Sequence, residues 1–162
     1  YALELDLTPA PMLSVFGGKI TTYRRLAEEA VSMLAGRLGA RATPWTAAAT
    51  RPGGDLPQGS FALFLRTLER RYPWLPAPLR VRYAHAYGTR LERVLGNATA
   101  ISALGAEVLP QLYECEIEYL CREEFAQRAD DILWRRSKLG LHLLKLDTAP
   151  LARWLAAHQD AR

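Results

Sequence analysis

The chain has 162 residues, about half of them apolar, and a formal net charge of +4 at pH 7. This is enough for a domain with a sizeable core, and the lack of any low-complexity tract argues against a disordered chain. No apolar run approaches the ~18 residues needed to cross a bilayer, and the mild positive charge selects no class of partner.

The cysteines and histidines are too scattered to suggest a metal site. Cys115 and Cys121 lie in one predicted helix with no Cys or His at ligand spacing, so we expect neither a metal site nor a short-range disulfide. His85, His142 and His158 are isolated, and structural or surface roles are expected for them. Because the chain begins at a tyrosine and has no signal sequence, we expect a piece of a longer protein.

The N-terminal residues predict a β-hairpin. Residues 1–7 alternate between apolar and polar side chains, which is typical of a strand with one buried face. Residues 8–11 have turn chemistry, and residues 12–16 would return as a second strand. Because two isolated strands are barely stable in water, we expect them to be edge strands of a larger sheet.

A glycine pair, Gly17 and Gly18, separates this hairpin from a predicted helix. Apolar residues recur with a helical period over residues 20–38. Thr21 or Thr22 is expected to accept a hydrogen bond from a backbone amide as the N-cap. The order is therefore strand, glycine turn and helix.

The glycine turn could bind an anion. The free N–H groups at a helix start favour negative charge, the glycines leave the backbone accessible, and Lys19 adds a positive charge. The turn is not a P-loop, because Leu13 stands where the first glycine would be and Ile20 replaces the final Ser or Thr. The spacing leaves two interpretations open, a plain tight turn and an anion or cofactor site.

Proline and glycine concentrate in residues 40–59, which predicts a linker. The chain then divides into residues 1–39, this linker, and residues 60–162. Helical signals continue through the last part. We expect a mainly α protein, in which a helical bundle follows a β-hairpin and one helix.

Cap residues, glycines and prolines mark the helix ends after residue 60. Ser60 is expected to cap one helix, Gly88 to end the next, and Thr89 with Glu92 to form a capping box for a short third helix. Pro110 predicts an extended segment around it. The later apolar positions expected to face the core are Ile117, Leu120, Cys121, Phe125, Leu133, Leu141, Leu151, Trp154 and Leu155. Trp134 is expected either in the core or at a contact between domains.

Three cations, Arg135, Arg136 and Lys138, lie within about one helical turn. They could bind phosphate, lipid headgroups or an acidic partner. Asp131 lies one turn before Arg135, which favours a structural charge network.

Residues 13–28 read Leu-Ser-Val-Phe-Gly-Gly-Lys-Ile-Thr-Thr-Tyr-Arg-Arg-Leu-Ala-Glu. This run resembles the closing motif of the flavin domain in the FAD-dependent, quinone-linked glycerol-3-phosphate dehydrogenases. Residues 70–74, 87–97 and 128–140 contain motifs similar to those of the same family, in the same order. The resemblance therefore covers nearly the whole chain.

The resemblance implies that residues 1–39 end an FAD-binding domain and that residues 60–162 form its helical C-terminal domain. The parent enzyme would oxidise sn-glycerol 3-phosphate to dihydroxyacetone phosphate and pass electrons through FAD to quinone. The residues implied to bind the cofactor are Gly17, Gly18, Lys19, Ile20 and Thr21, along the pyrimidine end of the isoalloxazine ring, and Lys19 would also face the substrate.

The same resemblance places the dinucleotide-binding glycines, the catalytic proton acceptor and most substrate contacts upstream of this chain. We therefore assign no catalytic residue and expect the chain alone to bind no FAD and to be inactive. The parent would lie on the cytoplasmic face of the respiratory membrane, held peripherally. A homodimer is left open.

A second hypothesis treats residues 60–162 as a helical module for interaction, dimerisation or docking on a membrane surface. Nucleic acid is not an expected partner, because the aromatic residues fall at core spacing and do not alternate with a basic stripe.

Overall fold

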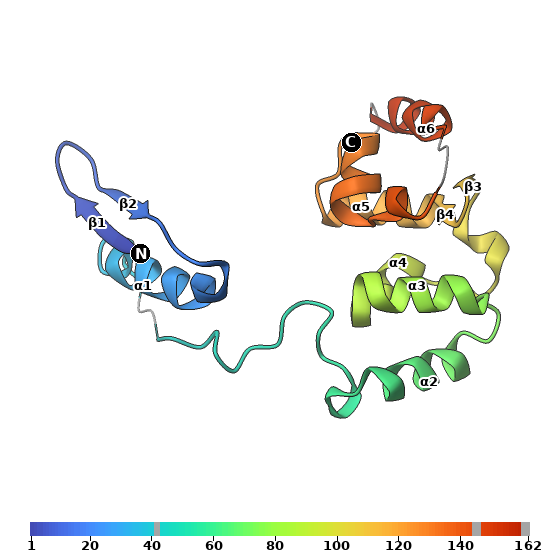
Figure 1. Cartoon of the computed structure of the whole chain (residues 1–162), viewed down its shortest axis with the longest axis horizontal. Helices are drawn as coiled ribbons and strands as arrows, with labels where there is room; N and C mark the ends of the chain where they lie inside the picture. Colours follow the sequence, from blue (N-terminus) through green and yellow to red (C-terminus); the bar gives the residue numbers. More distant parts are fainter. Residues whose placement is uncertain (41–42, 144–146, 160–162) are drawn as a thin grey trace. The chain divides into compact units, whose positions relative to one another are not determined.

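The computed structural model describes residues 1–40, 43–143 and 147–159. The chain forms two compact units, Tyr1–Thr50 and Arg51–Arg162, which are described separately (Figure 1). The fold is mainly helical with two small sheets, so the predicted fold class is confirmed. The first unit ends within the segment expected to be a linker; the domain limits at residues 39 and 59 stay predictions.

The first unit is a hairpin followed by a helix. Strands β1 (Ala2–Asp6) and β2 (Met12–Phe16) pair antiparallel in the described part, and α1 (Tyr23–Ala35) follows a short 3-10 helix, η1 (Ile20–Thr22). Within β1 the side chains of Leu3 and Leu5 are half-buried, as the alternation predicts, but Tyr1 and Leu7, which the same alternation places on the buried face, are both 46% exposed because the strand ends before them. The hydroxyl of Tyr1 donates a 2.8 Å hydrogen bond to Glu29, which links the hairpin to α1.

Two details at the start of α1 differ from the prediction. Thr22 is the N-cap, but its hydroxyl donates to the carbonyl oxygen of Lys19 at 2.9 Å and does not accept from an amide, so the predicted cap bond is wrong. The helical period places Ile20 on the buried stripe, but its side chain is 90% exposed. The reason is that η1 has a tighter turn than an α-helix, which changes the direction of its side chains.

The second unit contains the remaining elements. They are η2 (Pro57–Gly59), α2 (Phe61–Arg71), α3 (Ala77–Tyr87), η3 (Gly88–Arg90), α4 (Leu91–Leu95), η4 (Ile101–Leu104), β3 (Glu107–Leu109), β4 (Leu112–Tyr113), α5 (Glu114–Glu123), η5 (Asp131–Arg136), η6 (Leu139–Leu141) and α6 (Ala149–Gln159). The segment predicted as extended is the hairpin β3–β4.

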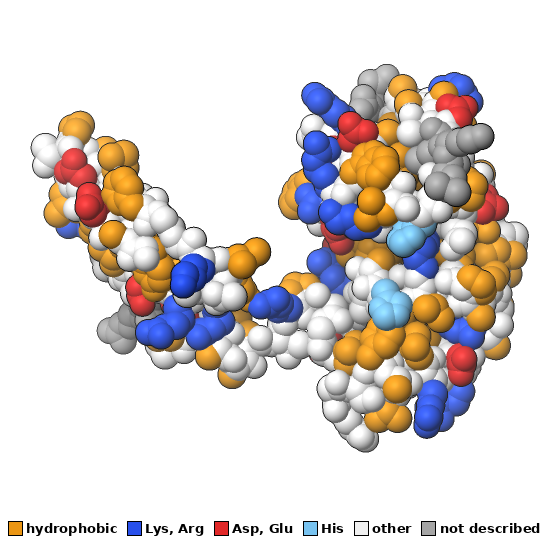
Figure 2. All heavy atoms as spheres, in the orientation of Figure 1, with side chains coloured by type: hydrophobic (Ala, Val, Ile, Leu, Met, Phe, Trp, Pro, Cys, Tyr) orange, Lys and Arg blue, Asp and Glu red, His pale blue; other side chains and the backbone are white. Residues whose placement is uncertain are grey.

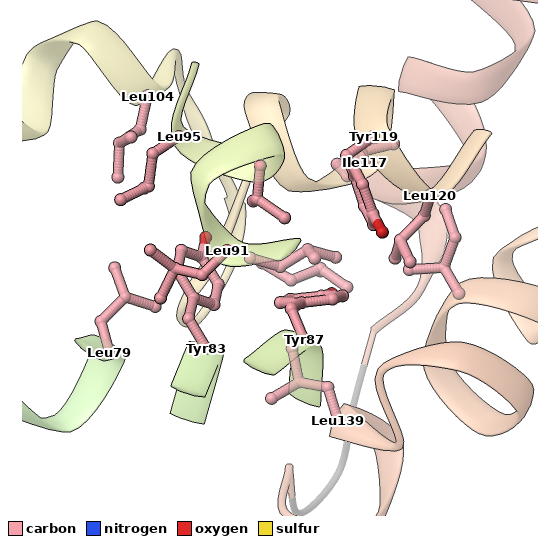
Figure 3. Packing of buried hydrophobic residues seen from close by; sticks show 14 of the residues in the cluster. Leu79, Tyr83, Tyr87, Leu91, Leu95, Leu104, Ile117, Tyr119, Leu120 and Leu139 are labelled. Atoms are coloured by element: carbon pink, nitrogen blue, oxygen red, sulfur yellow. The ribbon is translucent and has the colours of Figure 1, made fainter. Parts of the chain in front are cut away.

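The core of this unit lies between α3, α4 and α5 (Figure 3). Leu79, Tyr83 and Tyr87 of α3 point toward α4 and α5. The opposing buried side chains include Leu91, Leu95, Leu104, Ile117, Tyr119 and Leu120. From α6, Leu151, Trp154 and Leu155 are buried as predicted.

Phe125 and Leu141, expected in the core, are exposed, and so is Trp134, for which the core was one of two expectations. Phe125 is 80% exposed because the chain leaves α5 before it and Phe125 itself has a left-handed backbone (φ 58°). Trp134 and Leu141 are 45% and 68% exposed. The segment that holds Trp134, η5, is a π-helix, whose wider turn does not repeat with the α-helical period used for the prediction.

The predicted helix ends are mostly confirmed. Ser60 accepts a 3.3 Å hydrogen bond from the amide of Leu63, and Gly88 ends α3 with φ 55°. The capping box is wrong: the hydroxyl of Thr89 donates to Asp55, and the carboxylate of Glu92 binds Arg71.

A buried carboxylate joins α3 to α5. Glu116 is fully buried and accepts hydrogen bonds from Arg82 Nη1 (2.8 Å), from Arg82 Nη2 (2.5 Å) and from the hydroxyl of Tyr87. The same guanidinium donates to the carbonyl oxygen of Gln111 at 2.5 Å. Burial raises the pKa of the neighbouring Cys115 thiol to about 12, and the charge of Glu116 adds to this effect. The thiol is therefore neutral at pH 7.

Candidate functional site

The glycine turn after β2 has a backbone that other residues rarely adopt. Gly17 and Gly18 have φ values of 72° and 125°, and Lys19 returns to an extended conformation before η1 begins. A side chain on Gly17 would meet no atom within 4 Å, so glycine is required there by the conformation and not by crowding among the described residues. The turn therefore leaves its backbone open to a ligand.

The start of the helix beyond the turn carries unsatisfied donors. The first N–H groups of a helix have no acceptor inside it, and neither Lys19 nor Thr22, the two cap residues, makes a side-chain cap bond. The amide and hydroxyl of Thr22 both donate to the carbonyl oxygen of Lys19 at 2.9 Å, and among the described residues no acceptor is found for the amides of Ile20 and Thr21. Such an end favours negative charge.

The side chains of the turn are also exposed. Lys19, Ile20 and Thr21 are all exposed, and no ion pair of Lys19 is found in the described part of the chain. The structure thus brings Gly17, Gly18 and these three residues together on one turn with donors, a cation and an apolar side chain. Their binding role stays a prediction.

These residues fit one edge of a flavin. The pyrimidine edge of its ring system is planar and carries carbonyl oxygens, so it could lie against the bare backbone of the glycine pair and accept from the amides of Ile20 and Thr21. Lys19 could stand beside that edge with its charge, and Ile20 offers apolar surface. Among the described residues, no group of three or more His, Cys, Asp or Glu is placed to hold a metal ion.

The cations of η5 are partly engaged. Arg135 forms the expected pair with Asp131, at 3.0 Å, and Lys138 donates to the carbonyl oxygen of Trp134 at 2.7 Å. No such bond is found for Arg136 within residues 1–40, 43–143 and 147–159. A charge network is therefore confirmed for Arg135 alone.

Two histidines pack on aromatic rings. His85 lies against Phe61, with ring centroids 4.3 Å apart, and His158 stacks on Trp154 at 4.0 Å. These contacts are structural, as expected. Sequence reasoning missed the buried Glu116, because a glutamate in a helix with charged neighbours gives no sign of burial.

The chain belongs to a known family. Residues 15–153 match the family described as the C-terminal domain of alpha-glycerophosphate oxidase, which confirms the resemblance seen in the sequence. None of the described helices is long and apolar enough to span a bilayer.

Similar curated proteins agree with this family. A glycerol-3-phosphate dehydrogenase of Pseudomonas aeruginosa is 45% identical over 152 residues, and the aerobic glycerol-3-phosphate dehydrogenase of Escherichia coli is 41% identical over 153 residues; each match covers 94% of this chain and 30% of the relative. A D-erythritol 1-phosphate dehydrogenase of Brucella abortus is 39% identical over 155 residues, covering 95% of this chain and 31% of that protein. The chain thus spans about 30% of the length of these relatives.

Proposed function

We propose that this chain is the C-terminal part of an FAD-dependent dehydrogenase that oxidises sn-glycerol 3-phosphate to dihydroxyacetone phosphate. The observation that carries the proposal is the open glycine turn at Gly17 and Gly18, followed by an uncapped helix start, within a chain of this family. The relatives from Pseudomonas aeruginosa and Escherichia coli are both named as glycerol-3-phosphate dehydrogenases, which supports the substrate.

The residues of the turn would hold one edge of the cofactor. The backbone of Gly17 and Gly18 would contact the pyrimidine edge, the amides of Ile20 and Thr21 would donate to it, and the ammonium of Lys19 would add charge beside the substrate. When bound, FAD would supply the electron acceptor for oxidation of the alcohol. The turn itself holds no proton acceptor, which we place in the part of the parent that precedes this chain.

We propose that quinone receives the electrons and that the parent associates peripherally with the respiratory membrane, at its cytoplasmic face. This places the enzyme beside a hydrophobic electron acceptor. A homodimer is compatible with the proposal but is not required by it.

A second substrate has some support. The relative named for D-erythritol 1-phosphate is almost as similar as the two named for glycerol 3-phosphate. Both compounds are phosphorylated polyols with a secondary alcohol, so the residues of this chain would serve either one. Discrimination would depend on residues outside it.

An absorption spectrum of the full-length protein tests the proposal. We expect a bound flavin whose visible absorption is bleached anaerobically by glycerol 3-phosphate, and less efficiently by D-erythritol 1-phosphate. A full-length protein without flavin, or a flavin that glycerol 3-phosphate leaves oxidised, would refute it. The 162-residue chain alone should purify without flavin; a stoichiometric yellow cofactor would show that the dinucleotide fold is not needed.

A further inference from the structure

The glycine turn and helix α1 are joined by two hydrogen bonds from one residue, Thr22. Its amide and its hydroxyl both donate to the carbonyl oxygen of Lys19, each at 2.9 Å. Lys19 is extended (φ −100°, ψ 146°), and Thr22 is the N-cap of α1. Lys19 itself is exposed, and Figure 2 shows Lys and Arg side chains beside hydrophobic ones on the surface of this unit. Thr22 therefore holds the backbone at the point where the turn becomes a helix.

A threonine at this position usually caps the helix. Its side-chain oxygen would accept a hydrogen bond from an amide of the first turn, but the hydroxyl of Thr22 makes no such bond. The first turn of α1 also contains no acidic residue, which is another common way to compensate a helix start. In the described part of the chain, the positive end of this 13-residue helix is thus left without a cap, and the hydroxyl of Thr22 binds the turn instead.

The bond of Thr22 differs from the ordinary bonds of hydroxyls within helices. Ser32 and Thr67 donate to carbonyl oxygens four residues earlier in the same helix, at 2.7 Å and 3.0 Å. Serine and threonine often make such bonds inside helices. The acceptor of Thr22 is the carbonyl of Lys19, which lies outside α1, so this hydroxyl constrains a residue of the candidate site.

The direction of one donor follows from this bond. The carbonyl and the N–H of a trans peptide lie in one plane and point in opposite directions, and the peptide between Lys19 and Ile20 is trans. Because Thr22 holds the carbonyl of this peptide, the N–H of Ile20 is turned away from Thr22. That N–H has no acceptor among the described residues. Thr22 thus sets the direction in which the first amide of the helix start can bind a ligand.

We propose that Thr22 is a positioning residue for the flavin edge, which acts through the peptide between Lys19 and Ile20 and does not contact the cofactor. This role rests on the proposed function, in which the amide of Ile20 donates to the pyrimidine edge. Negative charge develops on that edge when flavin is reduced, so a donor held in a fixed direction stabilises the reduced form more than the oxidised form. The hydroxyl of Thr22 should therefore affect the redox equilibrium of FAD as well as its affinity.

Variants of the full-length parent test the role of this hydroxyl. Thr22→Val removes it with little change of shape, and Thr22→Ala removes it without a branched side chain. Both should raise the Kd of FAD about threefold. Both should also shift the equilibrium between reduced and oxidised flavin about tenfold toward the oxidised form, which is about 30 mV for a two-electron couple. Thr22→Ser keeps the hydroxyl and should restore both values.

A matched variant separates positioning from stability. Thr67→Val removes a hydroxyl-to-carbonyl bond of the same kind in the other unit. Thermal melts of the holoenzymes should show similar losses for the two valine variants. Photoreduction beside a dye of known potential, without glycerol 3-phosphate, should show a change of potential only for Thr22→Val.

An unchanged Kd and potential in Thr22→Val and Thr22→Ala would overturn the positioning role. So would an equal shift in Thr22→Ser or in Thr67→Val, because side-chain shape or general destabilisation would then explain it. A flavin that glycerol 3-phosphate leaves oxidised would instead overturn the proposed function, while the potentials, measured without substrate, would still decide the role of Thr22. A parent without bound flavin would overturn both.

Discussion

Gly88 lies so close to Gly53 that neither residue has room for a side chain. The carbonyl oxygen of Gly53 accepts a 3.1 Å hydrogen bond from the amide of Thr89, and a methyl group on Gly88 would overlap that oxygen. This contact holds residues 51–55 against the C-terminal end of α3. Both glycines also have positive φ values, 84° and 55°.

Gly88→Ala should therefore destabilise the helical unit by more than backbone strain alone. Gly96→Ala is the matched control, because Gly96 has φ 54° but no atom within 4 Å of an added methyl. The control should lose about 1–2 kcal/mol of unfolding free energy, and Gly88→Ala about 2 kcal/mol more. Urea unfolding measures both, and equal losses would show that the close contact is unimportant.

Removal of residues 51–59 should make the helical unit less stable. Residues 60–162 should give a cooperative, helix-dominated melt in far-ultraviolet circular dichroism, because their caps and apolar periodicity agree. Residues 51–162 should be more stable by about 1–3 kcal/mol, since they keep the bonds of Gly53 and Asp55 to Thr89. A non-cooperative melt of the shorter segment would instead mean that residues 51–59 are needed for folding.

Loss of the buried carboxylate of Glu116 should be severe. Glu116→Ala leaves the guanidinium of Arg82 largely buried without its partner, at a cost of about 3–5 kcal/mol. Replacing both residues, with Glu116→Leu and Arg82→Met, should recover part of this loss, because no uncompensated charge remains. Glu92→Gln, which breaks the exposed pair with Arg71, serves as the control and should cost less than about 1 kcal/mol. Similar losses at Glu116 and Glu92 would contradict the burial of the first pair.

The attachment of α6 should weaken in acid. Glu114 accepts from the amide of Ala106 and from the indole of Trp154, both at 2.8 Å, and these bonds lower the pKa of its carboxyl. Because the folded pKa lies below the ordinary value of 4.5, this contribution to stability is present above about pH 4.5 and is lost as the pH falls through the lowered value.

Glu114→Gln removes that titration. The variant should be about 1–3 kcal/mol less stable at pH 7. The difference in unfolding free energy between the variant and the unchanged chain should become smaller as the pH falls below the ordinary carboxyl value of 4.5. Urea unfolding at several pH values gives the comparison. A gap that stays constant with pH would mean that Glu114 is not the titrating group.

Lys19→Ala should impair the parent enzyme without unfolding it. Lys19 is exposed and forms no ion pair with the described residues, so its removal should change stability by less than ~0.5 kcal/mol. If its ammonium contacts the substrate or the flavin edge, kcat/KM for glycerol 3-phosphate should fall about ten- to a hundredfold. Steady-state kinetics and a thermal melt on one sample separate the two effects. Unchanged kcat/KM with FAD still bound would restrict the site to the backbone of Gly17 and Gly18.

Local signals in the sequence predict much of the fold. The alternation within residues 2–6, the cap at Ser60 and the glycine stop at Gly88 depend on neighbours within a few residues, and the structure confirms them. The capping box fails because both of its side chains have partners far away in the sequence: Thr89 binds Asp55 and Glu92 binds Arg71. Periodicity cannot foresee such competition.

The candidate site, like the fold, can be predicted only in part from local sequence patterns. The glycine pair and the helix start are visible in the sequence, and the structure adds the conformations that leave the amides of Ile20 and Thr21 without a cap. Of the two expectations for Trp134, a place in the core is wrong, because it assumes an α-helical period where η5 is a π-helix; a contact between domains stays a prediction. The burial of Glu116 depends on Arg82, 34 residues away, and no local pattern encodes it.

The hairpin of the first unit has a consequence for handling the isolated chain. In the described part of the chain, β1 and β2 pair only with each other, so each strand keeps one row of free N–H and C=O groups. Met12, Val15 and Phe16 of β2 are about half exposed. Free strand edges with apolar side chains are templates for a further strand from another molecule. Concentrated samples should therefore self-associate through β2, and a lysine in place of Val15 should keep them monodisperse.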